Sequence, residues 1–145
     1  MTETGKHPKL SIIIPAKNEA AVIGDVVSSV RGVCKDAEIL VVDDGSTDDT
    51  AALAEQPGVR VIRHPVSLGN GAAIKAGARA ASGDILIMMD GDGQHKAEDI
   101  PSLLEKLDEG YDMAIGARDS GSHAGVGRLA ANGLYNVFAS MISGH

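Results

Sequence analysis

Short runs of β-branched residues alternate with stretches of helical periodicity along most of this 145-residue chain. Apolar runs predict strands at Leu10–Ile14, Glu38–Val42, Val59–Arg63, Ile85–Met89 and Asp112–Ile115. The spacing between them predicts helices at Ala20–Val33, Thr47–Glu55, Gly71–Ala81 and Glu98–Glu109. Such alternation is typical of a mostly parallel sheet with helices on both faces. The sequence therefore predicts an α/β fold.

Residues near the element ends give more local expectations. Ser46 stands where an N-cap would begin the second helix, and Gly83 where a C-cap would end the third. Pro101 is compatible with the fourth helix only in its first turn. The run Ile85–Met89 is almost wholly apolar, so we expect this strand to be buried on both faces.

The charge of the chain restricts its partners. The formal net charge is −7, from 20 acidic and 13 basic residues. Nucleic-acid-binding proteins usually carry a basic stripe, so we expect no nucleic-acid partner. The acidic side chains would repel a phosphate-bearing ligand unless a divalent cation offset their charge. Tyr111, Tyr135 and Phe138 are the only aromatic residues, which leaves few surfaces on which bases could stack.

The sequence shows no secretion or membrane-spanning signal. The longest uncharged apolar runs, such as Leu10–Ala16, are strand-sized, whereas a membrane span needs about 20 residues. Met1–Lys9 is polar and is expected to be an N-terminal tail, not a signal peptide. The single cysteine, Cys34, cannot form an internal disulfide. We therefore expect a cytoplasmic protein.

Polar and largely acidic segments follow three of the predicted strands. Pro15–Glu19 follows the first strand, Asp43–Ser46 the second and Asp90–His95 the fourth. Open parallel sheets bind ligands beyond the carboxyl ends of their strands, so these segments are expected to meet at one ligand-binding edge. Any one of them alone could be structural, with Asp43 or Asp44 merely capping the next helix.

The sequence Asp90-Gly91-Asp92 suits a divalent metal. Residues two apart in an extended or turning segment point the same way, so one carboxylate can bind Mg²⁺ or Mn²⁺ and the other a water or a ligand hydroxyl. Magnesium usually keeps open positions for phosphate oxygens. Gly91 and Gly93 would let the backbone approach a ligand closely. We expect Asp90 and Asp92 to hold a metal that neutralises a diphosphate.

Other motifs fit less well. An EF-hand loop beginning at Asp90 would have Pro101 in place of its twelfth-position acid. Gly69–Lys75 fails the P-loop spacing, and the turn after the first strand lacks a dinucleotide fingerprint. A zinc site and a nucleophile elbow are not supported. A phosphoacceptor receiver domain remains a rival because of the acidic pair that ends Ile39–Asp44, but no lysine follows Lys106.

The last part of the chain changes character. Gly116–Gly127 is rich in glycine and serine and is expected to be a flexible loop. Beyond it, apolar residues recur at helical spacing over Leu134–Ile142. This amphipathic helix either docks on the core or meets a membrane surface, a missing downstream segment or a partner subunit, as in a homo-oligomer.

Four ordered motifs together resemble those of the family 2 glycosyltransferases, enzymes of the GT-A fold that use nucleotide-diphospho-sugars. The motifs are Ser11–Glu19, Ile39–Asp48, Gly69–Gly77 with the following Ser82–Asp84, and Met89–His95. The last motif is most similar to that of the polyprenyl-phosphate sugar transferases, including dolichol-phosphate mannose synthases. The resemblance covers about residues 10–118.

The resemblance implies a Rossmann-like GT-A core over residues 10–118, preceded by the tail at 1–9. Residues 119–145 would begin an acceptor region that is missing, so the fold would be truncated at its C-terminal end. It also implies inverting, Mg²⁺- or Mn²⁺-dependent transfer of a sugar from a UDP- or GDP-linked donor to a polyprenyl phosphate, on the cytoplasmic face of a membrane. The implied donor-binding residues are Pro15, Lys17, Glu19, Asp43, Asp44, Met89, Asp90, Gly91, Asp92, Gln94 and Arg118.

The chain also departs from the family pattern. Lys17 stands where the subfamily usually has an aromatic residue, and Asn70 where many relatives have lysine or arginine, so the base of the donor is left open. No residue is assigned as a catalytic base. Two alternatives stay open: a catalytically inactive donor-binding fragment or interaction module, and a nucleotidyltransferase. The latter usually opens with a glycine- and arginine-rich loop, which Pro15–Glu19 lacks.

Overall fold

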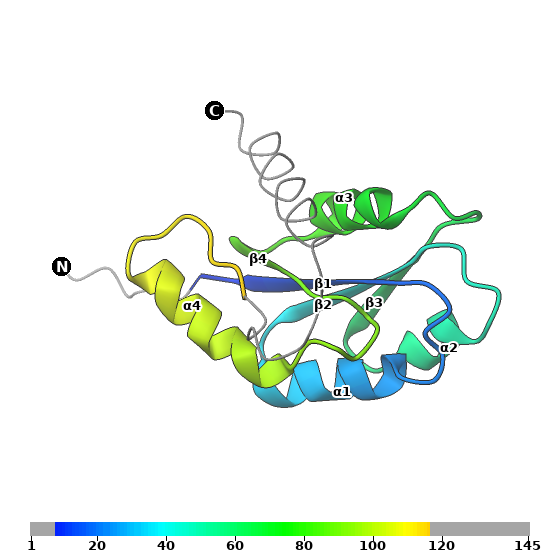
Figure 1. The fold of residues 1–145 in the computed structure, drawn as a ribbon, viewed down its shortest axis with the longest axis horizontal. Coiled ribbons are helices and arrows are strands. Elements are labelled where there is room, and N and C mark those ends of the chain that lie inside the picture. The colour runs from blue at the N-terminus through cyan, green and yellow to red at the C-terminus, as the bar shows by residue number, and fades with distance from the viewer. Residues whose placement is uncertain (1–7, 117–145) are drawn as a thin grey trace, which may run out of the picture. The chain divides into compact units, whose positions relative to one another are not determined.

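The computed structural model describes residues 8–116 (Figure 1). Its strands are β1 (Leu10–Ala16), β2 (Glu38–Asp43), β3 (Val59–Arg63) and β4 (Ile85–Met88). Its helices are α1 (Ile23–Val33), α2 (Thr50–Ala54), α3 (Asn70–Ala80), the short 3₁₀ helix η1 (Ala97–Asp99) and α4 (Ile100–Asp108). None of the helices described is long and apolar enough to cross a membrane.

The four strands form one parallel sheet in the order β3-β2-β1-β4. Ile13 at the centre of β1 is in register with Leu40 of β2 and Met88 of β4. Because every strand runs the same way, all four carboxyl ends lie at one edge of the sheet. The predicted α/β fold with a parallel sheet is confirmed, and this edge is the one that the acidic segments follow.

Helices cover both faces of the sheet, as expected (Figure 1). One face carries α1, α2 and α4, where Val27 and Val30 of α1 pack with Ile12 of β1. The other face carries α3, whose Ala73 packs against Ile13 and the rest of a smaller cluster. Burial of these aliphatic side chains, at about 25 cal/mol per Å² of apolar surface, holds the strands in register.

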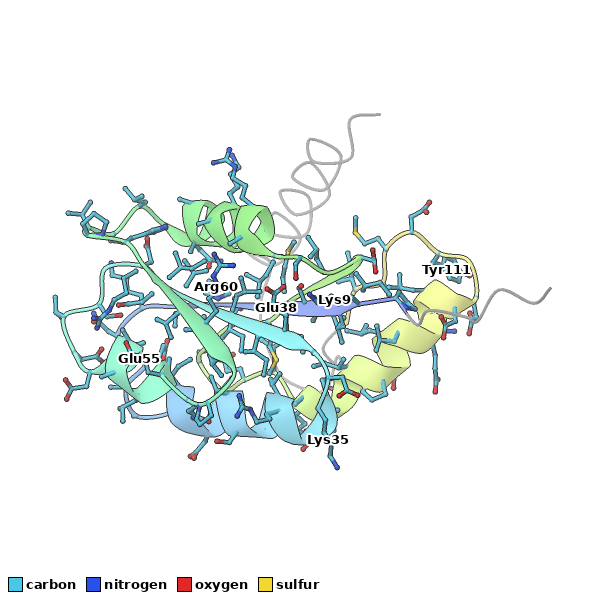
Figure 2. All side chains as sticks on the ribbon, turned by 180° about the vertical axis from the view of Figure 1, so that it is seen from behind. Lys9, Lys35, Glu38, Glu55, Arg60 and Tyr111 are labelled. Atoms are coloured by element: carbon cyan, nitrogen blue, oxygen red, sulfur yellow. The ribbon has the colours of Figure 1, made fainter. Side chains whose placement is uncertain are left out.

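A hydrogen-bonded cluster ties β1, β2 and the start of β4 together at the amino edge of the sheet. Glu38 Oε2 accepts hydrogen bonds from Ser11 Oγ at 2.6 Å and from Ser82 N at 2.8 Å, and Lys9 lies close by (Figure 2). The amide of Gly83 donates to Ser11 Oγ at 2.9 Å. The hydrogen bond from Ser11, followed by those from Ser82, lowers the pKa of Glu38.

The expected C-cap at Gly83 is wrong, because α3 ends at Ala80 with Ala81 as its C-cap. A Cβ on Gly83 would lie 2.6 Å from Ser11 Oγ and 2.7 Å from Lys9 O. The glycine therefore permits a close approach between chain segments and does not end the helix.

Two expectations about helix starts also need correction. Residues 20–22 form turns, so α1 begins at Ile23, and α2 begins only at Thr50. Ser46 does not cap α2, because its hydroxyl accepts a hydrogen bond from the amide of Asn18. Side chains that bond the neighbouring loop are unavailable to start a helix, which shortens it.

The expectations for the last two strands fail. β4 is an edge strand among the described residues, and Leu86 and Met88 are each 39% exposed on its α3 face, so it is not buried on both faces. Residues 112–115 form no strand. Tyr111, Met113 and Ile115 alternate as a strand would, but all three are exposed and unpaired with the sheet. Alternation alone does not supply a pairing partner.

The described residues up to Ala114 belong to one compact unit. Of the expected loop at Gly116–Gly127, the structure describes only Gly116. Arg118 and the expected Leu134–Ile142 helix lie outside the described residues.

Candidate functional site

The loops that follow the four strands surround a cavity of about 460 Å³ at the carboxyl edge of the sheet. Residues from the segments after β1, β2 and β4 line it, as the position of the acidic clusters predicts. The predicted site residues that the structure brings together here are Pro15, Lys17, Glu19, Asp44, Asp90, Gly91 and Asp92.

Four other predicted site residues are not among those that line this cavity. Asp43 lines a neighbouring hollow, where its Oδ1 accepts the Ser46 amide at 3.0 Å and Arg63 Nε lies 3.8 Å from its Oδ2. Met89 is only 6% exposed and packs in the core on the α1 face. Gln94 is exposed in the turn after Asp92, and Arg118 lies outside the described residues.

Asp44 organises the wall of the cavity on the β3 side. Asp44 is only 4% exposed, and its carboxylate accepts four hydrogen bonds from the segment that follows β3. His64 Nδ1 donates at 2.8 Å and Ser67 Oγ at 2.8 Å. The amides of Leu68 and Gly69 donate at 2.8 Å and 2.9 Å. This carboxylate therefore fixes the turn that leads into α3.

The surroundings of Asp44 also set its charge. Burial by itself would raise the pKa of its carboxyl group, but the hydrogen bonds from His64, Leu68, Ser67 and Gly69 outweigh it and hold the pKa far below its usual range. Asp44 is thus a permanent anion at neutral pH whose oxygens are already bonded within the protein.

Lys17 and Ser67 connect the two sides of the cavity. Lys17 follows β1 and Ser67 follows β3, and Lys17 Nζ donates to Ser67 Oγ at 3.0 Å. Ser67 in turn donates to Asp44, which follows β2. A single chain of hydrogen bonds thus spans the carboxyl ends of three adjacent strands.

The segments after β1 and β2 are also interlocked. Asn18 adopts φ 53°, a conformation that asparagine tolerates better than most residues, and its Oδ1 accepts the amide of Thr47 at 2.9 Å. Thr50 Oγ1 accepts the amide of Glu19 at 2.8 Å, and Asp48 accepts the amide of Ala20 at 3.2 Å. These contacts place Lys17 and Glu19 beside the cavity.

The turn after β4 holds Asp90 and Asp92 against the end of β1. Gly91 N donates to Pro15 O at 3.1 Å, and a Cβ on Gly91 would lie 3.0 Å from Ala16 Cβ. Asp92 Oδ1 accepts the amide of Gln94 at 2.9 Å, which closes the turn. Glycine is needed here because the turn packs directly on the strand.

The two carboxylates of this turn suit a divalent cation that also binds a phosphate. Both Asp90 and Asp92 line the cavity, and the Asp90 side chain is half exposed, with His95 Nε2 at 3.3 Å from its Oδ2. Within residues 8–116, no group of three or more His, Cys, Asp or Glu side chains gathers as a metal cage. Magnesium and manganese sites of nucleotide enzymes commonly use one or two carboxylates and take the remaining oxygens from phosphates.

The sequence reasoning missed the contribution of the segment after β3. Four of its residues line the cavity, namely Ser67, Gly69, Asn70 and Ala73, and His64 supports Asp44 through a hydrogen bond. The rule that ligands bind beyond the carboxyl ends of parallel strands applies equally to β3 and would have indicated this segment. Its Gly69–Gly77 part is one of the family motifs, but none of its residues is among the predicted donor-binding residues, because the segment carries no acidic side chain.

Comparison with known proteins identifies the family. The sequence profile described as Glycosyl transferase family 2 matches residues 11–135. Undecaprenyl-phosphate 4-deoxy-4-formamido-L-arabinose transferase of Enterobacter sp. (strain 638) is 37% identical over 123 residues, covering 78% of this chain and 38% of that protein. The protein of the same name from Salmonella paratyphi A is 32% identical over 154 residues, covering 99% of this chain and 47% of that protein. The chain thus spans less than half the length of these relatives.

Solved structures show the same fold. Glucosyl-3-phosphoglycerate synthase from Mycobacterium tuberculosis, in complex with Mn²⁺, UDP and glucosyl-3-phosphoglycerate, has a TM-score of 0.61 and 33% identity, covering 70% of this chain and 40% of that one. A Pyrobaculum calidifontis mannosyltransferase in complex with GDP-Man and Mn²⁺ has a TM-score of 0.56 and 25% identity, covering 60% and 28%. The expected GT-A fold is confirmed, and the chain belongs to glycosyl transferase family 2.

Proposed function

We propose that this chain carries the donor site of a metal-dependent, inverting glycosyltransferase. The donor is a nucleotide-diphospho-sugar, linked to UDP or GDP, and the acceptor is a polyprenyl phosphate. The reaction takes place on the cytoplasmic face of a membrane, where a lipid phosphate is accessible to a peripheral protein.

One observation carries the proposal: Asp90 and Asp92 share a cavity with polar residues from the loops after β1, β2 and β3. The cavity volume of about 460 Å³ falls within the range of small-molecule sites. The names of the curated relatives support a polyprenyl-phosphate acceptor, and the bound ligands of the structural relatives support a nucleotide donor with Mn²⁺.

Asp90 and Asp92 are the residues that would hold the cation, with His95 orienting the Asp90 carboxylate. A bound Mg²⁺ or Mn²⁺ supplies positive charge for the diphosphate that leaves during transfer. The chain itself needs this charge, because four acidic side chains line the cavity and, within residues 8–116, Lys17 is the only lysine that does so; the acidic residues are Glu19, Asp44, Asp90 and Asp92.

The acceptor also fits the side chains present. A lipid phosphate is already anionic at neutral pH, so its attack on the anomeric carbon needs little help from a general base. Among the described residues, none that lines the cavity is a histidine, and Asp44 is bonded on both carboxylate oxygens. An attack from the face opposite the leaving diphosphate inverts the configuration at the anomeric carbon.

A thermal-shift panel tests the donor part of the proposal. The chain would be heated with UDP-, GDP-, CDP- and ADP-sugars, each with Mn²⁺, with Mg²⁺ and with EDTA. We expect stabilisation by a UDP- or GDP-sugar only with metal, reaching about 2.7 kcal/mol at 100 times the dissociation constant. No stabilisation by any nucleotide sugar with either metal would contradict the proposal.

A transfer assay separates the enzyme from its alternative, a binding module without catalysis. The 145-residue chain would be incubated with radiolabelled nucleotide sugar, Mn²⁺ and undecaprenyl phosphate in detergent, and the label extracted into organic solvent counted. Label in the lipid fraction supports transfer. Metal-dependent donor binding without labelled lipid would instead support the binding module.

A further inference from the structure

The segment between β3 and β4 differs in charge from the rest of the chain. His64–Gly83 carries no acidic residue, although the formal net charge of the whole chain is −7. Lys75 and Arg79, four residues apart, lie on one face of α3 and are exposed. The opposite face of α3 is buried through Ala73 and Ile74. The outer face of α3 is therefore cationic.

The helices on the other face of the sheet are acidic. Five acidic residues stand against two basic ones in α1, α2, η1 and α4, whereas α3 has two basic residues and no acidic one. Arg60 of β3 adds a third cation on the α3 side, where its Nη1 donates to Ala80 O at 3.0 Å (Figure 2). Exposed charges are screened beyond about 8 Å in physiological salt. An anionic surface that approaches α3 therefore meets mainly cations.

Two exposed apolar side chains stand just before α3. Val66 is 60% exposed and Leu68 is 58% exposed. Figure 1 shows that the segment after β3 continues beyond α3 on the same side of the sheet. The amides of Leu68 and Gly69 both donate to the buried carboxylate of Asp44. These bonds fix the backbone of the segment while its two apolar side chains remain in solvent.

The same segment also forms a wall of the cavity. Ser67, Gly69 and Asn70 line the cavity, and the two exposed apolar residues alternate with them along the chain. A surface that contacts Val66 and Leu68 therefore lies next to the cavity. The phosphate of a polyprenyl phosphate lies at the headgroup level of a bilayer, so an acceptor could reach this cavity while its chain stays in the lipid.

We propose that this part of the chain docks on an anionic lipid bilayer. The docking surface, here called the α3 surface, consists of Val66, Leu68, Lys75 and Arg79. Apolar side chains enter the boundary between headgroups and acyl chains, and cations attract anionic headgroups. This inference rests on the proposed function and deepens it, because it names the surface that brings the donor cavity to the membrane of the acceptor.

A vesicle sedimentation assay tests the α3 surface. The 145-residue chain would be mixed with vesicles of equal parts phosphatidylcholine and phosphatidylglycerol, or of phosphatidylcholine alone, without nucleotide or metal. We expect binding to the mixed vesicles and much weaker binding to phosphatidylcholine alone. Each lysine or arginine near an anionic surface strengthens binding about fivefold, so Lys75→Ala with Arg79→Ala should lower the partition coefficient by about tenfold or more. Val66→Ser with Leu68→Ser should lower it by about fivefold or more, because less apolar surface enters the lipid.

Matched control variants lie away from α3. Lys35→Ala with Lys106→Ala removes the same charge from exposed positions, and Figure 2 shows Lys35 on the α1 side of the sheet. Leu53→Ser removes an apolar side chain of α2 that is 47% exposed. Both controls should bind the mixed vesicles within about twofold of wild type. Circular dichroism would verify that every variant folds.

Failure of the wild-type chain to bind the mixed vesicles would overturn the inference, as would equal binding by the α3-surface variants and their controls. A dimer in sedimentation velocity that Val66→Ser with Leu68→Ser disperses would also overturn it, because a second copy would then occupy the surface. Calorimetry with UDP, GDP and Mn²⁺ separates this inference from the proposed function. Nucleotide binding without vesicle binding overturns the docking surface alone, whereas vesicle binding without nucleotide binding supports the docking surface and contradicts the proposed donor site.

Discussion

Asp43 and Asp44 are neighbours in the sequence, but their side chains line different hollows. Asp44 lines the main cavity and is bonded to the segment after β3, whereas Asp43 lines the adjacent hollow beside Arg63. The sequence could place both at the end of β2, because the run of apolar residues before them is clear. It could not decide which one faces the cavity, because that depends on the turn that leaves the strand.

We predict that Asp44→Asn destabilises the fold. The amide would place a donor where the carboxylate accepts the backbone N–H groups of Leu68 and Gly69. Leaving a buried donor unpaired costs about 1–3 kcal/mol, which urea unfolding would measure. Asp36→Asn, at an exposed turn before β2, is the control and should stay within about 0.5 kcal/mol of wild type. Equal stability of the two variants would show that Asp44 is not an anchor.

The lowered pKa values of Asp44 and Glu38 predict loss of stability in acid. A carboxyl group whose pKa is lower in the folded than in the unfolded state stabilises the fold above its unfolded pKa. That contribution is lost as the pH falls through the folded value, so unfolding free energy should decline from about pH 4 downward. Urea unfolding from pH 7 to pH 3 measures this. Asp44→Asn should flatten the decline, and an unchanged slope in that variant would exclude Asp44 as its source.

At the scale of the elements, the strongest signals gave correct predictions. Four strands and four α-helices of the described residues follow the expected order. They were predictable because apolar residues that recur with a helix or strand period mark the face that is buried. The failures lie where partners decide the outcome. Ser46 bonds Asn18 and does not cap α2, and residues 112–115 find no strand to pair with among the described residues. A single sequence does not reveal such partners, because they come from distant parts of the chain.

Gly83 provides a test of the cluster at the amino edge. Gly83→Ala would place a Cβ 2.6 Å from Ser11 Oγ, and overpacking of this kind costs about 1–3 kcal/mol. Gly32→Ala in α1 is the matched control, because a Cβ there would meet nothing within 4 Å and alanine favours helix by about 1 kcal/mol. We expect the melting temperature to fall for the first variant and to rise for the second. A rise for both would contradict the close packing of Gly83.

At the scale of the whole molecule, both the net charge and the sheet topology bear on the carboxyl edge of the sheet. A chain with net charge −7 offers a diphosphate an unfavourable field, and the parallel sheet gathers acidic residues from separate segments at one edge. A divalent cation between Asp90, Asp92 and the diphosphate would turn this repulsion into attraction. The alternation of strands and helices in the sequence predicts this edge, because it implies a mostly parallel sheet whose acidic segments follow the strands. The same rule also indicates the segment after β3, although none of its residues is among the predicted donor-binding residues, because it carries no acidic side chain.

The most direct test compares nucleotide affinity in the wild-type chain, Asp92→Asn and the matched control Asp36→Asn, with Mn²⁺ and with EDTA. Isothermal calorimetry with UDP and GDP would give the dissociation constants, and circular dichroism would verify that each variant folds. The account predicts tight binding only with Mn²⁺ in wild type and Asp36→Asn, and at least a tenfold loss in folded Asp92→Asn. Equal affinity in all three proteins, or binding that survives EDTA, would contradict it.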